Sequence, residues 1–229
     1  MSKPSKRMNA NRESIDSNRH YSLDEAILLL KKTGNIKFNE TIDIAINLGI
    51  DPKKSDQNLR GSMVLPNGTG KTLKVIVFAQ NEQVDDAKNA GADEVGLEDL
   101  AERIKSGFSE FDLVIATPDT MRIVGQLGQI LGPKGMMPNP KDGTVTKNVE
   151  DAVTKAKTGQ IRFRSDKGGV VHCRIGKTDF SEQSIKENLG SLLDEIVKTK
   201  PPSAKGAFIK KVTISSTMGP GITIDHSTI

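Results

Sequence analysis

Apolar and polar positions follow two different periods along this chain of 229 residues. Before residue 66 and after residue 159, apolar residues alternate with polar ones, which is typical of strands with one buried face. Between them, at 73–79 and 111–118, the apolar runs are continuous, as in strands that are buried on both faces. The chain therefore changes its type of sheet twice.

The outer stretches predict an α+β arrangement. A helix is expected at 22–34, because Ser22 can cap its first turn and Glu25 follows three residues later. The other elements expected here are strands at 40–50 and 62–66, a β-hairpin of 161–164 and 170–176 around the turn 165–169, a helix at 181–200 capped by Ser181, and a strand at 207–216.

The middle stretch predicts strands that alternate with helices, which implies a parallel sheet covered on both faces. Besides the two continuous strands, we expect a short strand at 92–96, helices at 81–91, 97–107, 119–132 and 148–159, and a turn-rich loop at 132–145.

The simplest architecture has two domains, one α+β and one α/β. A discontinuous α+β domain would comprise residues 1–66 and 160–229, with a Rossmann-like three-layer α/β domain of residues 67–159 inserted into it. The chain would cross between them near Pro66–Gly70 and near Gly159. The candidate hinge residues are Pro66, Gly68, Gly70 and Gly159.

Residues 65–72, LPNGTGKT, end like a phosphate-binding P-loop. That loop needs a glycine five positions before Gly70, where this chain has Leu65, and it must open a helix. Here the strand at 73–79 follows instead. The sequence thus favours a flexible domain connection, and a small NTPase that uses Lys71 is the alternative.

Composition argues against several other kinds of site. Cys173 is the one cysteine, so no intrachain disulfide can form, and the three histidines are scattered without zinc spacing. No Ser-His-Asp order and no dinucleotide-binding glycine pattern is recognisable. We therefore expect no catalytic residue, no metal and no cofactor. The first residues lack an apolar core and no run is long enough to span a membrane, so we expect a soluble cytoplasmic protein.

Positive charge is concentrated in the outer stretches. Residues 67–159 hold 11 basic and 14 acidic residues, a net charge of −3, whereas the remainder holds 22 basic and 15 acidic residues, a net charge of +7. Residues 1–20 form a basic arm within that remainder. This distribution favours a nucleic-acid partner for the outer domain.

Three segments of the outer stretches suit RNA, and each has a simpler alternative. Phe38 is a core residue, which composition alone favours, or an exposed platform for a base. Arg162 and Arg164, near Lys167, share a strand face that suits phosphates or is only solvated. The segment 215–221, SSTMGPG, lets an RNA backbone approach closely or is a plain terminal turn.

Four segments together resemble the bacterial type of the large-subunit ribosomal protein L-one family, over nearly the whole chain. They are KFNETIDIAINLGIDPKKSDQNLRG, LPNGTGK, LGQILGPKGMMPNPKDGTV and TMGPG, of which the third is the most specific. The resemblance implies a split first domain that binds the mobile stalk of the large-subunit rRNA, beside the site where deacylated tRNA leaves. It implies an inserted Rossmann-like domain without a nucleotide.

The same resemblance implies partners and site residues. The partners are the rRNA stalk, exit-site tRNA and the mRNA of the protein's own operon, whose translation many members repress. The protein would be a part of the cytoplasmic large ribosomal subunit, monomeric when free and without catalysis. The implied RNA contacts are Lys37, Phe38, Glu40, Thr41, Lys54, Arg164, Lys167, Ser215, Thr217, Met218 and Gly219. A general RNA chaperone, which would bind unrelated structured RNAs equally well, remains an alternative.

Overall fold

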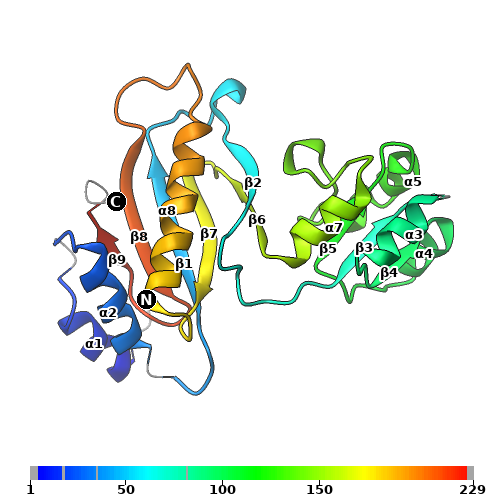
Figure 1. Cartoon of the computed structure of the whole chain (residues 1–229). Helices are drawn as coiled ribbons and strands as arrows, with labels where there is room; N and C mark the ends of the chain where they lie inside the picture. The colour runs from blue at the N-terminus through cyan, green and yellow to red at the C-terminus, as the bar shows by residue number, and fades with distance from the viewer. Residues whose placement is uncertain (1–4, 17–18, 35, 81, 226–229) are drawn as a thin grey trace. The chain divides into compact units, whose positions relative to one another are not determined.

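The computed structural model describes residues 5–16, 19–34, 36–80 and 82–225 (Figure 1). The chain forms two compact units, one of Met1–Gly70 with Ile161–Ile229 and one of Lys71–Gln160. The predicted combination of an α+β and an α/β fold is confirmed. Residues 1–4, 17 and 18 of the expected basic arm, and residue 81 of the expected helix 81–91, lie outside the described residues.

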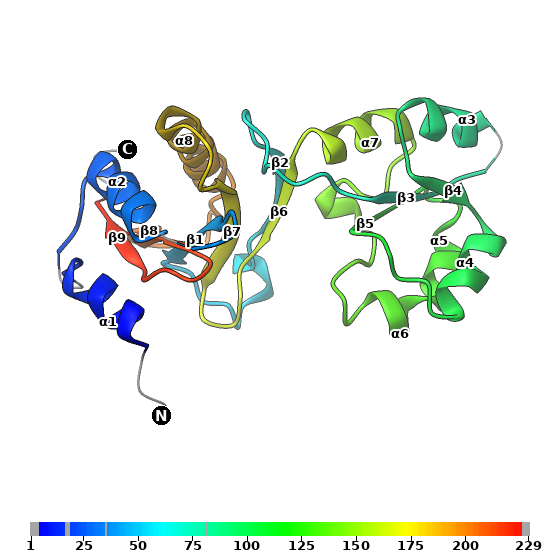
Figure 2. The ribbon, with the colours of Figure 1, turned by 90° about the horizontal axis from the view of Figure 1, so that it is seen from below.

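The first unit is built on an antiparallel sheet in the order β7-β1-β8-β9. Helices α2 (Leu23–Thr33) and α8 (Glu182–Lys198) cover one face of this sheet (Figure 2). Strand β1, from the first third of the chain, is paired on both sides by strands from the last third. The strands are β1 (Thr41–Leu48), β7 (Val170–Lys177), β8 (Ile209–Ser216) and β9 (Ile222–Ile224).

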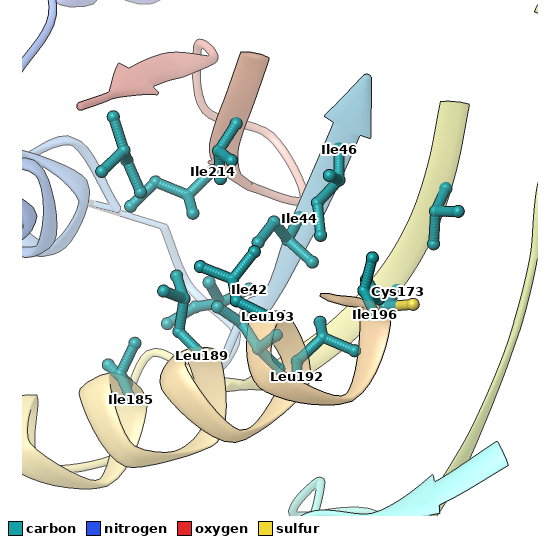
Figure 3. Close-up of a cluster of buried hydrophobic side chains, with 14 of the residues drawn as sticks. Ile42, Ile44, Ile46, Cys173, Ile185, Leu189, Leu192, Leu193, Ile196 and Ile214 are labelled. Carbon is teal, nitrogen blue, oxygen red and sulfur yellow. The ribbon is translucent and has the colours of Figure 1, made fainter. Parts of the chain in front are cut away.

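The core of the first unit is aliphatic and lies between the sheet and the two helices (Figure 3). Alternation along β1 turns one side chain in two toward the helices, and these side chains are fully buried. Each such burial stabilises the fold by about 1.5–3 kcal/mol. The central side chains are Ile42, Ile44 and Ile46 of β1, Ile214 of β8, and Ile185, Leu189, Leu192, Leu193 and Ile196 of α8.

Both predicted N-caps of these helices are confirmed. The Ser22 hydroxyl accepts a hydrogen bond from the Glu25 N–H at 3.4 Å, and the Ser181 hydroxyl accepts one from the Ser184 N–H at 3.0 Å. The Glu25 carboxylate pairs with Arg19 at 3.2 Å. Capping satisfies amides that have no partner within the helix, so these serines fix where the helices begin.

The expected hairpin of 161–164 with 170–176 is wrong in its pairing. The turn does form, since the Asp166 N–H donates to the Val170 carbonyl at 2.9 Å. However, β6 (Gln160–Arg164) pairs with β2 (Arg60–Val64) in a separate two-stranded sheet, whereas β7 pairs with β1. Phe163 is buried against Gly61, where a Cβ would lie 2.7 Å from the ring, so this pairing leaves no room for a side chain at position 61.

Three elements of the first unit were not expected. Helix α1 (Lys6–Glu13) lies within the predicted basic arm, and β9 lies in the C-terminal stretch to which the sequence assigned no structure. A short helix, η1 (Ser55–Gln57), also interrupts the polar connection before β2. Helix α1 buries no side chain and so has no apolar period, and β9 and η1 have only three residues each, so the pattern of the sequence does not reveal them.

The second unit contains a parallel sheet, as predicted, and its strands lie in the order β4-β3-β5. Its strands are β3 (Val75–Phe78), β4 (Glu94–Gly96) and β5 (Leu113–Ala116), and every residue of β3 and β5 is buried. The helices are α3 (Glu82–Asn89), α4 (Glu98–Lys105), α5 (Met121–Gln126), α6 (Gly128–Leu131), α7 (Val149–Lys157) and the short η2 (Pro140–Asp142). The expected helix 119–132 is thus two short helices, because Gly125 and Gly128 lower the helix propensity there.

The stretch LPNGTGKT does not open a helix, because β3 begins at Val75. Instead, Asn188 of α8 binds the stretch. The Asn67 N–H donates to Asn188 Oδ1 at 3.0 Å, and Asn188 Nδ2 donates to the carbonyls of Gly68 at 3.0 Å and Ile175 at 2.8 Å. Asn188 is fully buried, so these bonds fix the connection to the first unit.

We expect Asn188→Ala to lower the free energy of unfolding of the first unit by roughly 2–4 kcal/mol, because it leaves buried backbone groups without partners. Tyr21 is the one tyrosine and lies in the core of this unit, so urea unfolding followed by tyrosine fluorescence measures the effect. Asn58→Ala, at an exposed side chain, is the matched control and should change stability by less than about 0.5 kcal/mol. Equal stability of the two variants would contradict the role of Asn188.

Candidate RNA-binding site

The predicted contact residues fall into two groups at opposite ends of the four-stranded sheet. Strand β1 begins at Thr41, beside Lys177, and ends at Leu48, beside Ile209. Eight extended residues span about 25 Å, so the structure does not gather the candidates at one point. Lys37, Phe38, Glu40, Thr41, Ser215, Thr217, Met218 and Gly219 belong to the first end, and Lys54, Arg164 and Lys167 to the second.

The turn that follows β8, residues 217–219, is fixed to the start of β1. The Thr217 N–H donates to the Thr41 carbonyl at 3.1 Å, and the Thr41 N–H donates to the Thr217 hydroxyl oxygen at 3.1 Å. The same hydroxyl also lies 3.3 Å from the Thr41 carbonyl. Because Thr217 is nonetheless exposed, its hydroxyl is presented at the surface in one orientation.

Glu40 holds the same turn from below. Its carboxylate accepts a hydrogen bond from the Met218 N–H at 2.7 Å, and its backbone carbonyl accepts one from the Thr178 N–H at 3.0 Å. Glu40 is fully buried, so it lies beneath the surface that Thr217 and Met218 form. Its role in this geometry is to position the turn.

Two polar atoms beside the turn have no hydrogen-bond partner within the described part of the chain, Glu40 Oε2 and Ser216 Oγ, and both are buried. Gly219 packs directly on Ser216 Oγ, because a Cβ at position 219 would lie 2.4 Å from that atom. A side chain at position 219 would therefore displace the turn, which explains the glycine.

Two large apolar side chains at this end are exposed to solvent, Phe38 at 51% and Met218 at 49%. The core position that composition alone favours for Phe38 is therefore wrong. Lys37, next to it, is also exposed. Exposed apolar side chains that lie together on a surface often mark an interaction site. The first end thus combines apolar, hydroxyl and cationic groups.

The face of the sheet that α2 and α8 leave uncovered carries polar side chains that the sequence analysis did not single out. Cross-strand pairing lines them up in rows, with Asp43 of β1 between Arg174 and Ser215, and Ala45 between His172 and Thr213. The alternation of each strand predicts exposed positions, but only the register shows which of them become neighbours.

Two ionisable groups of the sheet have shifted pKa values. Partial burial raises the pKa of Asp43, and this effect outweighs the electrostatic interactions with Arg174 and His172, which lower that pKa. Burial, with a smaller contribution from Asp43, raises the pKa of Cys173 to about 12. The Cys173 thiol therefore stays protonated at neutral pH and is a packing residue.

The second end presents cations on ordered loops. The Asp166 carboxylate accepts hydrogen bonds from the Gly168 and Val170 N–H groups, both at 2.8 Å. These bonds, that of Val170 foremost, hold the pKa of Asp166 below its usual value. Lys167 is exposed at the tip of this turn, and Arg164 is exposed where β6 ends. Lys54 is exposed in the loop after β1.

Lys71, the residue of the alternative nucleotide site, is paired with a carboxylate. Its Nζ lies 2.6 Å from Asp112 Oδ1, and this hydrogen bond is the main reason that the pKa of Asp112 is lowered. Within residues 5–16, 19–34, 36–80 and 82–225, no three His, Cys, Asp or Glu side chains cluster to hold a metal. None of the helices described there has the length and apolarity needed to cross a membrane.

The sequence matches known proteins over its whole length. Residues 29–220 match the Ribosomal protein L1p/L10e family. The chain is 57% identical over 229 residues to the "Large ribosomal subunit protein uL1" of Mannheimia succiniciproducens, with 100% of both chains covered. It is 58% identical over 229 residues to the protein of that name from Neisseria meningitidis serogroup C, with 100% of this chain and 99% of that protein covered. A match of this extent and identity confirms the resemblance of the four short segments, and the chain belongs to the Ribosomal protein L1p/L10e family.

Proposed function

We propose that this chain is a constituent of the large subunit of the cytoplasmic ribosome and that its discontinuous domain binds the mobile rRNA stalk. The name carried by its relatives supports the first part. The observation that carries the second is the 217–219 turn, an exposed hydroxyl, thioether and glycine held in place by Thr41 and Glu40.

The recognition is led by shape. Gly219 lets the RNA backbone come close, and the fixed Thr217 hydroxyl suits a ribose 2′-OH, which distinguishes RNA from DNA. Phe38 and Met218 offer apolar contact to a base or ribose. The cations Lys37, Lys54, Arg164 and Lys167, with Ser215, contact phosphates or riboses and set the orientation of the protein.

The second unit moves relative to the first and follows the stalk as deacylated tRNA leaves the exit site. Gly68, Gly70 and Gly159 have φ values of 65°, 70° and 106°, which glycine adopts without strain. Because Asn188 holds Asn67 and Gly68, we place the bending after that anchor, at Gly70 and at Gly159. Pro66 then belongs to the fixed part of the connection.

The protein acts without catalysis, is monomeric when free, and represses translation of its own operon by binding an mRNA site that mimics the rRNA site. Both RNAs would occupy the 217–219 turn, so an excess of rRNA releases the mRNA. The support for this part is the family to which the chain belongs.

The first test is a filter-binding titration with an rRNA stalk fragment and unrelated structured RNA as competitor. We expect Thr217→Ala to weaken binding roughly tenfold to hundredfold, since the loss removes an oriented hydroxyl and loosens the turn. Thr217→Ser, which keeps the hydroxyl, should restore most of the affinity. Thr154→Ala, an exposed threonine on α7 of the second unit, is the matched control.

Two results would oppose this proposal. If Thr217→Ala binds the stalk fragment as tightly as the unaltered protein does, the turn is not the contact. If unrelated RNA competes as well as the stalk fragment, the chain is a general RNA chaperone.

The second test is salt dependence, because phosphate contacts release counterions. We expect the logarithm of the affinity to fall linearly with the logarithm of the salt concentration, and Lys167→Ala to reduce that slope by about one unit. Lys88→Ala on α3, an exposed lysine of the second unit, should leave the slope unchanged. If Lys167→Ala and Lys88→Ala reduce the slope equally, the slope depends on the net charge of the protein and not on a phosphate contact of Lys167.

The third test addresses the P-loop alternative. Lys71→Ala breaks the ion pair with Asp112 and should leave stalk-RNA affinity unaltered, while neither protein binds ATP or GTP in equilibrium dialysis. Tight nucleotide binding that disappears with Lys71→Ala would return the NTPase interpretation.

A further inference from the structure

Helix α1 lies beside the 217–219 turn. The Arg7 guanidinium donates a hydrogen bond to the Met218 carbonyl at 3.2 Å, and the Asn11 side-chain amide donates one to the Thr33 carbonyl at 3.3 Å. Arg7 and Asn11 are four residues apart and thus share one face of the helix. This face is half-buried, whereas Lys6 and Arg12 point to solvent.

The helix is weakly held along its length and firmly held at its end. Its eight residues include no buried side chain, and isolated helices of this length are marginal in water. By contrast, Ile15 is buried directly after it, and the Asp16 N–H donates to the Tyr21 hydroxyl at 2.8 Å. Tyr21 in turn is buried and paired with the edge of the sheet. The geometry is that of a tethered arm.

The arm that reaches the first end of the sheet is cationic. It carries Lys6, Arg7 and Arg12 against Glu13 alone. Beyond the bond to Met218, the guanidinium of Arg7 has N–H donors that reach no acceptor in the described part of the protein. A guanidinium suits a phosphate because its planar fork can donate two parallel hydrogen bonds.

We propose that α1 is a second RNA-binding element, an arm whose cations contact the phosphate backbone of the same RNA that lies on the 217–219 turn. This inference rests on the proposed function. Arg7 connects α1 to the 217–219 turn, since it donates one N–H to the Met218 carbonyl and presents its other N–H groups to a phosphate. RNA would then order a helix that buries no side chain in the free protein.

The experiment measures stalk-fragment affinity and its salt slope for Arg7→Gln and for the double variant Lys6→Gln/Arg12→Gln. We expect Arg7→Gln to weaken binding about threefold to tenfold and to lower the salt slope by about one unit, as for one phosphate contact. Lys198→Gln, an exposed cation at the end of α8, makes the same charge change away from the arm and should alter neither quantity. Asn11→Ala loosens the arm without changing its charge, so it should weaken binding less and keep the slope.

Hydrogen exchange gives a readout that charge alone does not affect. The amides of residues 6–13 should exchange rapidly in the free protein and slow at least tenfold when the stalk fragment is added. Far-UV circular dichroism and the tyrosine-monitored urea midpoint should be unaltered in Arg7→Gln, because α1 buries no side chain.

The results separate this proposal from the function on which it rests. The arm proposal alone is overturned by the following set of results. Thr217→Ala weakens binding, the arm variants keep the affinity and salt slope of the unaltered protein, and RNA does not slow the exchange of residues 6–13. Unchanged binding by both Thr217→Ala and Arg7→Gln overturns the proposed function as well. Tighter binding by Arg7→Gln would make α1 a competitor of RNA and would also overturn the proposal.

Discussion

The pairing of β1 between β7 and β8 is the constraint on which the first unit depends. It joins residues that are more than a hundred positions apart, such as Thr41 and Thr217, and such contacts carry the largest cost in loop-closure entropy. The gain is that both ends of the chain contribute to one rigid surface. The 217–219 turn has its present shape only because the start of β1 lies beside it and supplies hydrogen-bond partners on both sides.

The same pairing places a buried carboxylate under the candidate site. Burying Glu40 is unfavourable unless its oxygens are paired, and one of them accepts the Met218 N–H while the other has no partner in the described structure. The buried Glu40 carboxylate costs stability, and what it provides in return is a hydrogen bond that fixes the 217–219 turn. Gly219 also packs closely on Ser216, since a Cβ at this position would lie 2.4 Å from Ser216 Oγ.

Much of the fold could be predicted from the sequence because its signals are local. Alternation, continuous apolar runs and the caps at Ser22 and Ser181 each act over a few residues and were confirmed. What failed depends on distant residues. Strand β6 packs Phe163 on Gly61 of the distant strand β2, and α1 and β9 are stabilised by contacts with the rest of the unit. At the site, family resemblance suggested the residue types, but only strand register shows that they divide between two ends of a sheet.

That division limits the kind of RNA that fits. A ligand that touches both the 217–219 turn and the loops with Lys54 and Lys167 must present its backbone across about 25 Å, which a folded RNA surface does and one splayed base does not. Among the expected contacts, the first end has Lys37 as its cation, while the second has three. Affinity from phosphates would therefore be concentrated at the second end and shape recognition at the first. The cations of α1 lie where they offset this imbalance, because Arg7 reaches the turn itself.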